Sequence, residues 1–184
     1  MIAAETLDRR LHAFRPDLAD RALQGRVEAA RFVDARPALI AVPVADLHNA
    51  PSSEAGIDTQ FLLGEPVRVF DVDRGWAWIQ GAVDGYVGYV PGSSLSFESE
   101  PQPTHRVVAL RSYVFPEPDL KKPPLTTLSM GSRIAVAGRE ERRGTRYAVL
   151  ADGLALPAAH VAPVGDNAAD FVAVAERFLH TPYL

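Results

Sequence analysis

The stretch GWAWIQGAVDGYVGYV, residues 75–90, has the pattern of a β-hairpin. Residues 76–80 and 86–90 are rich in aromatic and β-branched side chains, which are typical of strands. Asp84-Gly85 lies between them, and this dipeptide favours the tight turns that join antiparallel strands. A further alternating segment, residues 66–70, comes before the turn at Asp73-Arg74-Gly75. The stretch therefore predicts three consecutive strands of a small antiparallel sheet.

A later part of the chain repeats this unit. Gly64, Val67, Val69 and Pro51 correspond to Gly131, Ile134, Val136 and Pro118, 67 positions later, and Val90-Pro91 with Leu95 corresponds to Leu156-Pro157 with Val161 at an offset of 66. One deletion accounts for the change of offset. Each copy has about five short strands and ends in a proline and a short helical turn, which favours a small closed barrel without exposed strand edges.

The fold class predicted from this pattern is mainly β, with two tandem small SH3-like β-barrels, an N-terminal extension and a C-terminal helix. The N-terminal extension is expected to hold a short helix near residues 16–23 and a segment, 27–32, that packs on a barrel. A polar, proline-bearing linker joins the barrels. The predicted boundaries are 1–38 for the extension, 39–99 for the first barrel, 104–165 for the second and 166–184 for the helix.

Composition and charge exclude several classes of protein. The net charge is −4 and no basic face or run appears, so we expect no nucleic-acid partner. The chain has no cysteine, hence no disulfide framework, no thiolate metal site and no cysteine nucleophile among these residues. No run approaches the roughly 20 apolar residues of a membrane helix, and the first 14 residues show no signal peptide. We expect a cytoplasmic protein without a membrane partner.

The final residues, AERFLHTPYL, predict an amphipathic helix that ends before an aromatic stub. The stripe comprises Phe171, Ala175, Phe178 and Leu179, spaced as on one helix face. Asp166-Asn167 are expected to cap the helix, and Pro182 bars helical geometry at the preceding residue, so the helix should end near His180. Such a stripe needs a partner surface; the alternative is an ordinary C-terminal docking helix.

No group of residues has the spacing of a catalytic or metal site. The five histidines share no metal-ligand spacing, no phosphate-binding loop exists, and Ser93-Ser94 lacks a nucleophile motif. We therefore predict no catalytic residue, no metal and no cofactor in this chain. Asp71 and Asp73 are interpreted as the acidic approach to a turn. Trp76 and Trp78 share a strand face, where they form either a binding shelf or part of the packing.

The repeat units resemble bacterial SH3 domains, on the motifs GE at 64–65, GWAWIQ at 75–80 and DGYVGYV at 84–90. With the terminal FVAVAERFLHTPYL, the order of units resembles the NlpC family of cysteine peptidases, which cut γ-D-glutamyl bonds in cell-wall peptides. In that family a Thr-Pro-Tyr-Leu-Trp-Gly-Gly segment opens the catalytic domain. The resemblance implies that this chain is the non-catalytic front of a larger enzyme, whose cysteine and histidine lie beyond Leu184, and that the chain alone is inactive.

The resemblance also implies a substrate and its contacts. In family members with paired SH3 units, the first unit recognises the free amine of an N-terminal L-alanine through an acid and a tyrosine. By motif these are Glu65 and Tyr86, with Tyr183 lining the pocket from the catalytic side. Tyr86 and Tyr89 should face opposite sides of their strand, one of them toward the core. The second unit has Ser132 in place of the acid, which implies a structural spacer.

Three functions remain open from the sequence. The first is the substrate-gating part of an endopeptidase that hydrolyses the γ-D-glutamyl-diamino acid bond of murein peptides, L-Ala-γ-D-Glu-diamino acid, during recycling; its partners are the peptide and the missing catalytic domain. The second is a non-catalytic module that binds cell-wall peptides. The third is a proline-peptide adaptor that uses Trp76 and Trp78, which the absence of an acidic loop beside a stacked aromatic groove disfavours.

Overall fold

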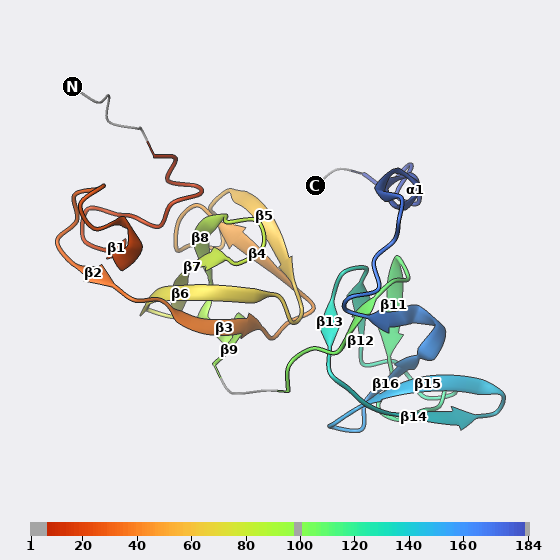
Figure 1. Ribbon diagram of the computed structural model, residues 1–184. Coiled ribbons are helices and arrows are strands. Elements are labelled where there is room, and N and C mark those ends of the chain that lie inside the picture. The colour runs from red at the N-terminus through yellow and green to blue at the C-terminus, as the bar shows by residue number, and fades with distance from the viewer. Residues whose placement is uncertain (1–6, 98–100, 183–184) are drawn as a thin grey trace. The chain divides into compact units, whose positions relative to one another are not determined.

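The computed structural model describes residues 7–97 and 101–182. The chain divides into two units, residues 1–100 and 101–184. Strands dominate both units, and nearly all their pairings are antiparallel (Figure 1). This confirms the predicted mainly β class.

The first unit is built on one antiparallel sheet. Its strand order is β5-β4-β8-β7-β6-β3-β9. The strands are β3 (Arg36–Ile40), β4 (Val44–His48), β5 (Ile57–Leu62), β6 (Pro66–Asp73), β7 (Trp76–Gly81), β8 (Val87–Pro91) and β9 (Leu95–Ser96), and the 3-10 turn η2 (Gly92–Ser94) leads into β9. The hairpins β6–β7 and β7–β8 are those that the sequence predicted.

The core of this sheet holds side chains from six of its strands. Alternating residues of β6, Val67 and Val69, point into it, as the period of two in a strand requires. Ile40 of β3 and Leu47 of β4 join the same cluster, although three strands, β8, β7 and β6, lie between β4 and β3 in the sheet order. Since separated strands share one core, the sheet curls around it.

The N-terminal segment, residues 8–33, builds a second core on the outer face of this sheet. Ala13 and Leu18 are buried against Phe70, Trp78 and Val87. The segment contains β1 (Ala19–Asp20), the 3-10 turn η1 (Arg21–Leu23) and β2 (Phe32–Val33), and β1 pairs with β2 in parallel. It therefore covers one face of the first unit (Figure 1).

The helix expected near residues 16–23 is wrong. Only Arg21–Leu23 are helical, in a 3-10 turn capped by the Asp20 side chain, which accepts a hydrogen bond from the Ala22 amide. Ala19 and Asp20 instead take the extended form and pair with β2. The burial of Leu18 and Ala19 against the sheet outweighs the weak helical preference of so short a segment.

The second unit repeats the strand pairings of the first. Its elements are β10 (His105–Val107), β11 (Arg111–Val114), β12 (Thr126–Ser129), β13 (Arg133–Ile134), β14 (Val136–Arg142), β15 (Thr145–Leu150), β16 (Ala155–Pro157), the 3-10 turn η3 (Ala158–His160) and β17 (Val161–Pro163). β10 pairs with both β13 and β17, as β3 pairs with β6 and β9. The pairs Val44↔Leu62 and Arg111↔Ser129 show the same register 67 positions apart.

The predicted single deletion between the copies is wrong, because one hairpin of the second copy is longer and the next is shorter than in the first copy. The rung Asp73↔Trp76 corresponds to Glu140↔Tyr147, and the β14–β15 hairpin continues for two more rungs before its turn. This adds four residues, whereas the chain between the paired residues Tyr147 and Pro157 is five residues shorter than that between Trp76 and Pro91. The two changes lie in exposed turns, where length varies most freely.

The only α-helix of the described residues is α1 (Phe171–Glu176). Its cap is Asp170, whose side chain accepts hydrogen bonds from the amides of Val172 and Ala173. The predicted cap at Asp166-Asn167 and the predicted end near His180 are therefore wrong. Phe171 is 83% exposed and Leu179 68% exposed, so the predicted apolar stripe is uncovered here.

No helix in the described part of the chain is long and apolar enough to span a membrane.

Candidate functional site

Two cross-strand rungs on the outer face of the first unit gather aromatic rings and carboxylates. Asp71 of β6 lies opposite Trp78 of β7, which lies opposite Tyr89 of β8. The next rung toward the β6–β7 turn is Asp73, Trp76 and Pro91. Directly paired residues share a sheet face, so both rungs point the same way. The sequence prediction that the two tryptophans share a face agrees with this geometry.

The Arg15 side chain of the N-terminal segment contacts all three residues of the first rung. Its guanidinium lies 4.4 Å from the centre of the Trp78 ring, within cation–π distance. The same group donates hydrogen bonds to the Asp71 carboxylate at 2.8 Å and to the Tyr89 hydroxyl at 3.3 Å. Asp17 accepts two more, at 2.9 and 3.1 Å. Each nitrogen of this guanidinium thus donates a hydrogen bond to a carboxylate or a hydroxyl, and the group lies against an aromatic ring.

These contacts keep the arginine charged. Burial opposes the charge, but the hydrogen bonds to Asp71, Asp17 and Tyr89 outweigh it and raise the pKa of Arg15. The hydrogen bonds from Arg15 in turn lower the pKa of Asp17. Arg15 and Asp17 thus hold each other in their charged forms at neutral pH.

A hollow of about 430 Å³ runs across both rungs; we name it the aromatic groove. A smaller hollow of about 280 Å³ adjoins it and shares Arg15, Asp17, Trp78 and Tyr89. Trp78 is almost fully buried, whereas Trp76 is half-buried and its ring meets His48 edge-on at 5.5 Å. The groove is lined by Arg15, Asp17, Arg31, Pro51, Asp71, Val72, Asp73, Trp76, Trp78 and Tyr89.

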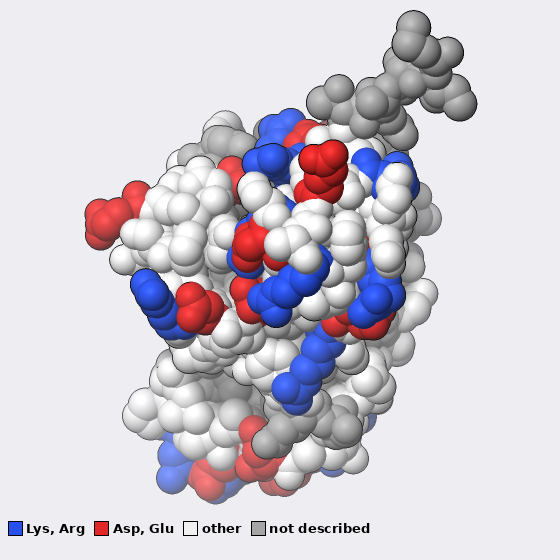
Figure 2. Space-filling model, turned by 90° about the vertical axis from the view of Figure 1, so that its left-hand side faces the viewer, with Lys and Arg blue, Asp and Glu red and all other residues white. Residues whose placement is uncertain are grey.

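The charges on this side of the molecule alternate in sign. Figure 2 shows basic and acidic side chains interleaved, with no broad area of one sign on the face in view. In the groove, two guanidiniums and three carboxylates lie together. The site is therefore suited to a small ligand that carries its own charges, and its electrostatics do not resemble a polyanion-binding surface.

Glu65 and Tyr86 lie at the opposite end of the β6–β7 hairpin. The Pro66 carbonyl, directly after Glu65, accepts a hydrogen bond from the Ala82 amide, and the Tyr86 carbonyl accepts one from the Gly81 amide. Their backbones therefore flank the same end of β7. Both residues are half-buried, and Tyr86 packs against the barrel core. Their roles toward a ligand stay predictions, and Tyr183 lies outside the described residues.

Tyr86, directly before β8, and Tyr89, within β8, face opposite sides, as their spacing predicted. Tyr86 joins the barrel core, whereas Tyr89 packs with Trp78 and the N-terminal segment on the outer face. The hydroxyl that faces the aromatic groove thus belongs to Tyr89. The interpretation of Asp71 as a simple approach to a turn is wrong, because it forms the ion pair with Arg15.

The equivalent face of the second unit carries different side chains; a hollow of about 590 Å³ lies there beside Glu140 and Pro157, and its lining contains no tryptophan. The rung that corresponds to Asp71, Trp78 and Tyr89 consists of Gly138, Val149 and Ala155. The counterpart of Trp76 is Tyr147, which is only 1% exposed, and its hydroxyl accepts a hydrogen bond from the Leu120 amide. The loop before β12 therefore closes over this ring. The two copies share a scaffold but differ in their outer faces.

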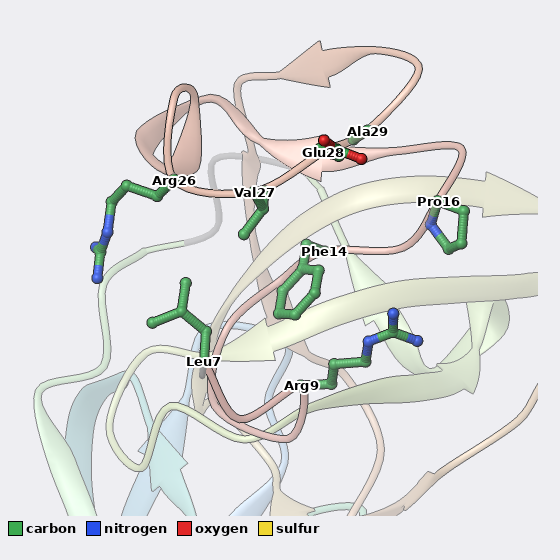
Figure 3. Close-up of a pocket in the computed structure, with 8 residues that line it drawn as sticks. All are labelled: Leu7, Arg9, Phe14, Pro16, Arg26, Val27, Glu28 and Ala29. Atoms are coloured by element: carbon green, nitrogen blue, oxygen red, sulfur yellow. The ribbon is translucent and has the colours of Figure 1, made fainter. Parts of the chain in front are cut away.

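A further pocket, of about 720 Å³, lies within the N-terminal segment (Figure 3). The side chains of Leu7, Phe14 and Val27 converge in it, while Arg26 extends away. The Arg9 guanidinium lies 5.0 Å from the centre of the Phe14 ring. This pocket contains none of the residues singled out from the sequence. Among the described residues, no three His, Asp or Glu side chains gather as a metal site would require.

The sequence did not reveal the contribution of the N-terminal segment. Arg15 reaches Asp71 and Tyr89, which lie 56 and 74 positions away in the sequence, while Asp17 pairs with Arg15 itself. The one signal in the sequence was a pair of aspartates beside two tryptophans on neighbouring strands. Carboxylates and aromatic faces together favour the binding of a cation. An arginine is the usual cation for a planar site of this kind.

Comparisons with known proteins agree on the type of fold. Residues 47–95 match the family model of the bacterial dipeptidyl-peptidase SH3 domain. The structure is similar to that of an NlpC/P60 family protein from Bacillus cereus ATCC 10987, with a TM-score of 0.61 and 20% sequence identity. That match covers 80% of this chain and 65% of the Bacillus protein, so the chain spans less than two thirds of that protein's length.

Other matches are weaker. NlpC2 from Trichomonas vaginalis matches with a TM-score of 0.30 and 8% identity, over 80% of this chain and 56% of that protein. NlpC1 from the same organism has the same score and identity, over 71% and 46%. No curated protein matches the chain. Residues 47–95 are thus similar to the SH3 domain of bacterial dipeptidyl-peptidases, within a fold similar to that of an NlpC/P60 protein.

Proposed function

We propose that this chain is the substrate-recognition part of a cell-wall peptide endopeptidase. The observation that carries the proposal is the match of residues 47–95 to the SH3 domain of bacterial dipeptidyl-peptidases. The fold likeness to an NlpC/P60 protein extends beyond that domain, over 80% of the chain. The second unit, which repeats the strand pairings of the first, is a second SH3-like barrel that acts as a spacer.

The substrate is a murein peptide with a free N-terminal L-alanine, cut at its γ-D-glutamyl-diamino acid bond. Glu65 pairs with the ammonium of the alanine, and Tyr86 contributes its hydroxyl or ring face. The geometry supports this assignment, since both backbones flank the same end of β7. Tyr183 lines the pocket from the other side. A peptide without a free amine offers no ammonium to the Glu65 carboxylate, and we expect this to weaken its binding.

The catalytic groups belong to a further domain that follows these two units. There a cysteine thiolate attacks the peptide carbonyl, a histidine acts as base and a polar group orients it. The uncovered apolar side chains of the terminal helix, with Phe171 and Leu179 foremost, pack into that domain. An amphipathic helix gains most of its stability from such packing. The complete enzyme acts in the cytoplasm, on peptide fragments recovered from the wall.

The reading frame after codon 184 and the activity of the chain test this proposal together. We expect the frame to continue with Trp-Gly-Gly and then Asp-Cys-Ser, and we expect the 184-residue chain not to hydrolyse L-Ala-γ-D-Glu-diaminopimelate. A stop codon after Leu184 would instead support a non-catalytic module that binds cell-wall peptides. Release of L-Ala-D-Glu by the purified chain would contradict the assignment of catalysis to another domain.

A further inference from the structure

The first rung of the aromatic groove shows which ligand chemistry this face accepts. There a guanidinium lies on the Trp78 ring, and its hydrogens are shared between the Asp71 carboxylate and the Tyr89 hydroxyl. The N-terminal segment itself supplies this cation, Arg15. The first rung is thus a cation-binding site that is already occupied by a cation of the chain itself.

The second rung repeats the same pair of groups, and among the described residues no guanidinium lies over its ring, Trp76, which meets His48 edge-on. Asp73 stands opposite Trp76, as Asp71 stands opposite Trp78. The Asp73 side chain is 76% exposed, and its ion pair with Arg74 is long, at 3.8 Å. In the second unit the corresponding ring, Tyr147, is closed off by the Leu120 amide. The first unit leaves this position half-open beside a groove.

The groove also contains a second arginine, Arg31, whose charge is opposite to that of Asp73. Arg31 is 61% exposed and contacts Asp71 only at 3.9 Å, because Arg15 already holds that carboxylate at 2.8 Å. Arg31 and Asp73 therefore offer one charge of each sign to a ligand. A guanidinium that is only weakly paired prefers a carboxylate partner.

We propose that the aromatic groove is a second binding site, which takes a short zwitterionic peptide. The peptide's ammonium lies on the Trp76 ring beside Asp73, and its carboxylate pairs with Arg31. A volume of about 430 Å³ suits a ligand of a few residues. The site does not depend on Glu65, which lies roughly 25 Å away along β6 at about 3.3 Å per residue.

Titration of the 184-residue chain with the tripeptide L-Ala-γ-D-Glu-L-Lys, followed by the NMR signals of the tryptophan indoles, tests the site. We expect the Trp76 indole signal to shift on binding. Asp73→Asn and Arg31→Gln should each weaken the affinity measured from that signal about three- to tenfold. Both residues are exposed, so these variants should fold. The control Asp34→Asn, in the exposed pair with Arg21, should bind as the wild type does.

Two modified peptides test the contributions of the peptide's positive and negative charges separately. Acetylation of both amines should abolish the effect of Asp73→Asn, and amidation of the carboxylates should abolish that of Arg31→Gln. The inference is overturned if the Trp76 signal stays unchanged at saturating peptide, or if both variants bind like the wild type. If Glu65→Gln alone weakens binding, the proposed function stands and the second site does not.

Discussion

Arg15 lies over the ring of Trp78, 4.4 Å from its centre, although 63 positions separate the two residues in the sequence. This contact joins the N-terminal segment to the SH3 sheet and fixes the charges of the aromatic groove. Because the Arg15 side chain is only 21% exposed, its ion pair with Asp71 is partly shielded from solvent. The segment is therefore an integral part of the first unit.

Arg15→Ala should destabilise the first unit by about 1–3 kcal/mol, since it removes a cation–π contact and leaves the Asp71 carboxylate without its closest cation. Chemical denaturation followed by tryptophan fluorescence measures the effect, because Trp78 is at the contact. The matched control is Arg21→Ala, whose ion pair with Asp34 is exposed and should contribute less than about 1 kcal/mol. Equal losses in the two variants would contradict the role of Arg15.

Tyr147→Phe should destabilise the second unit by about 1–2 kcal/mol. The hydroxyl belongs to a side chain that is 1% exposed and accepts a hydrogen bond from the Leu120 amide at 3.0 Å, so its removal deletes a partly buried hydrogen bond. Hydrogen exchange at the Leu120 amide should accelerate in the variant. Tyr113→Phe is the control, because Tyr113 is 54% exposed in the same unit. An unchanged exchange rate at Leu120 would show that the hydroxyl does not hold the loop.

The Asp119 carboxylate should make the second unit sensitive to acid. The Lys121 amide donates a hydrogen bond to it, and Arg142, Arg143 and Lys122 add their charges, so its pKa lies below the usual value of 3.8. A carboxyl whose pKa is lower in the folded state stabilises the fold above its unfolded pKa, and this stabilisation is lost as the pH falls through the folded value.

Asp119→Asn should therefore flatten the fall in stability between about pH 5 and pH 2. The measurement is the thermal unfolding midpoint of the second unit at a series of pH values, with the exposed Glu140→Gln as control. If the wild type and Asp119→Asn lose stability in parallel over that range, the carboxylate has no such role.

Gly88→Ala should cost about 1–3 kcal/mol in the first unit. A Cβ atom there would come within 2.7 Å of the His48 carbonyl oxygen and the Leu47 Cγ, closer than van der Waals contact allows. Gly138→Ala is the matched control, since its Cβ would meet no atom within 4 Å. Calorimetric unfolding of both variants tests this, and a neutral Gly88→Ala would mean that the β4–β8 contact yields without strain.

The sequence predicted the sheet well and the groove poorly. The hairpins around Asp84-Gly85 and Asp73-Arg74-Gly75 follow from local turn chemistry and alternation, which act within a few residues. The repeat was visible because both units use the same pairings. The placement of Leu18 and Arg15 on the outer face depends on contacts with distant strands, and no local pattern encodes those.

The terminal helix illustrates the same limit. Phe171 and Ala175 of the predicted stripe lie on α1, but the cap is Asp170 and the helix ends at Glu176, before Phe178 and Leu179. A cap depends on which side-chain oxygen reaches the first free amides, and several acidic or amide residues precede this helix. Without a covering surface in the described residues, the stripe does not extend the helix.

The most direct test of the central claim uses the proposed enzyme, with the catalytic domain that we expect to follow these two units. Its kcat/KM is measured on L-Ala-γ-D-Glu-diaminopimelate and on the N-acetylated form of the same peptide, for the wild type, Glu65→Ala and the control Asp34→Asn. Loss of a charge-assisted contact to the free amine should raise KM for the free peptide about 10- to 100-fold in Glu65→Ala and leave the acetylated peptide unaffected. A Glu65→Ala enzyme that matches the wild type on both peptides would contradict the account.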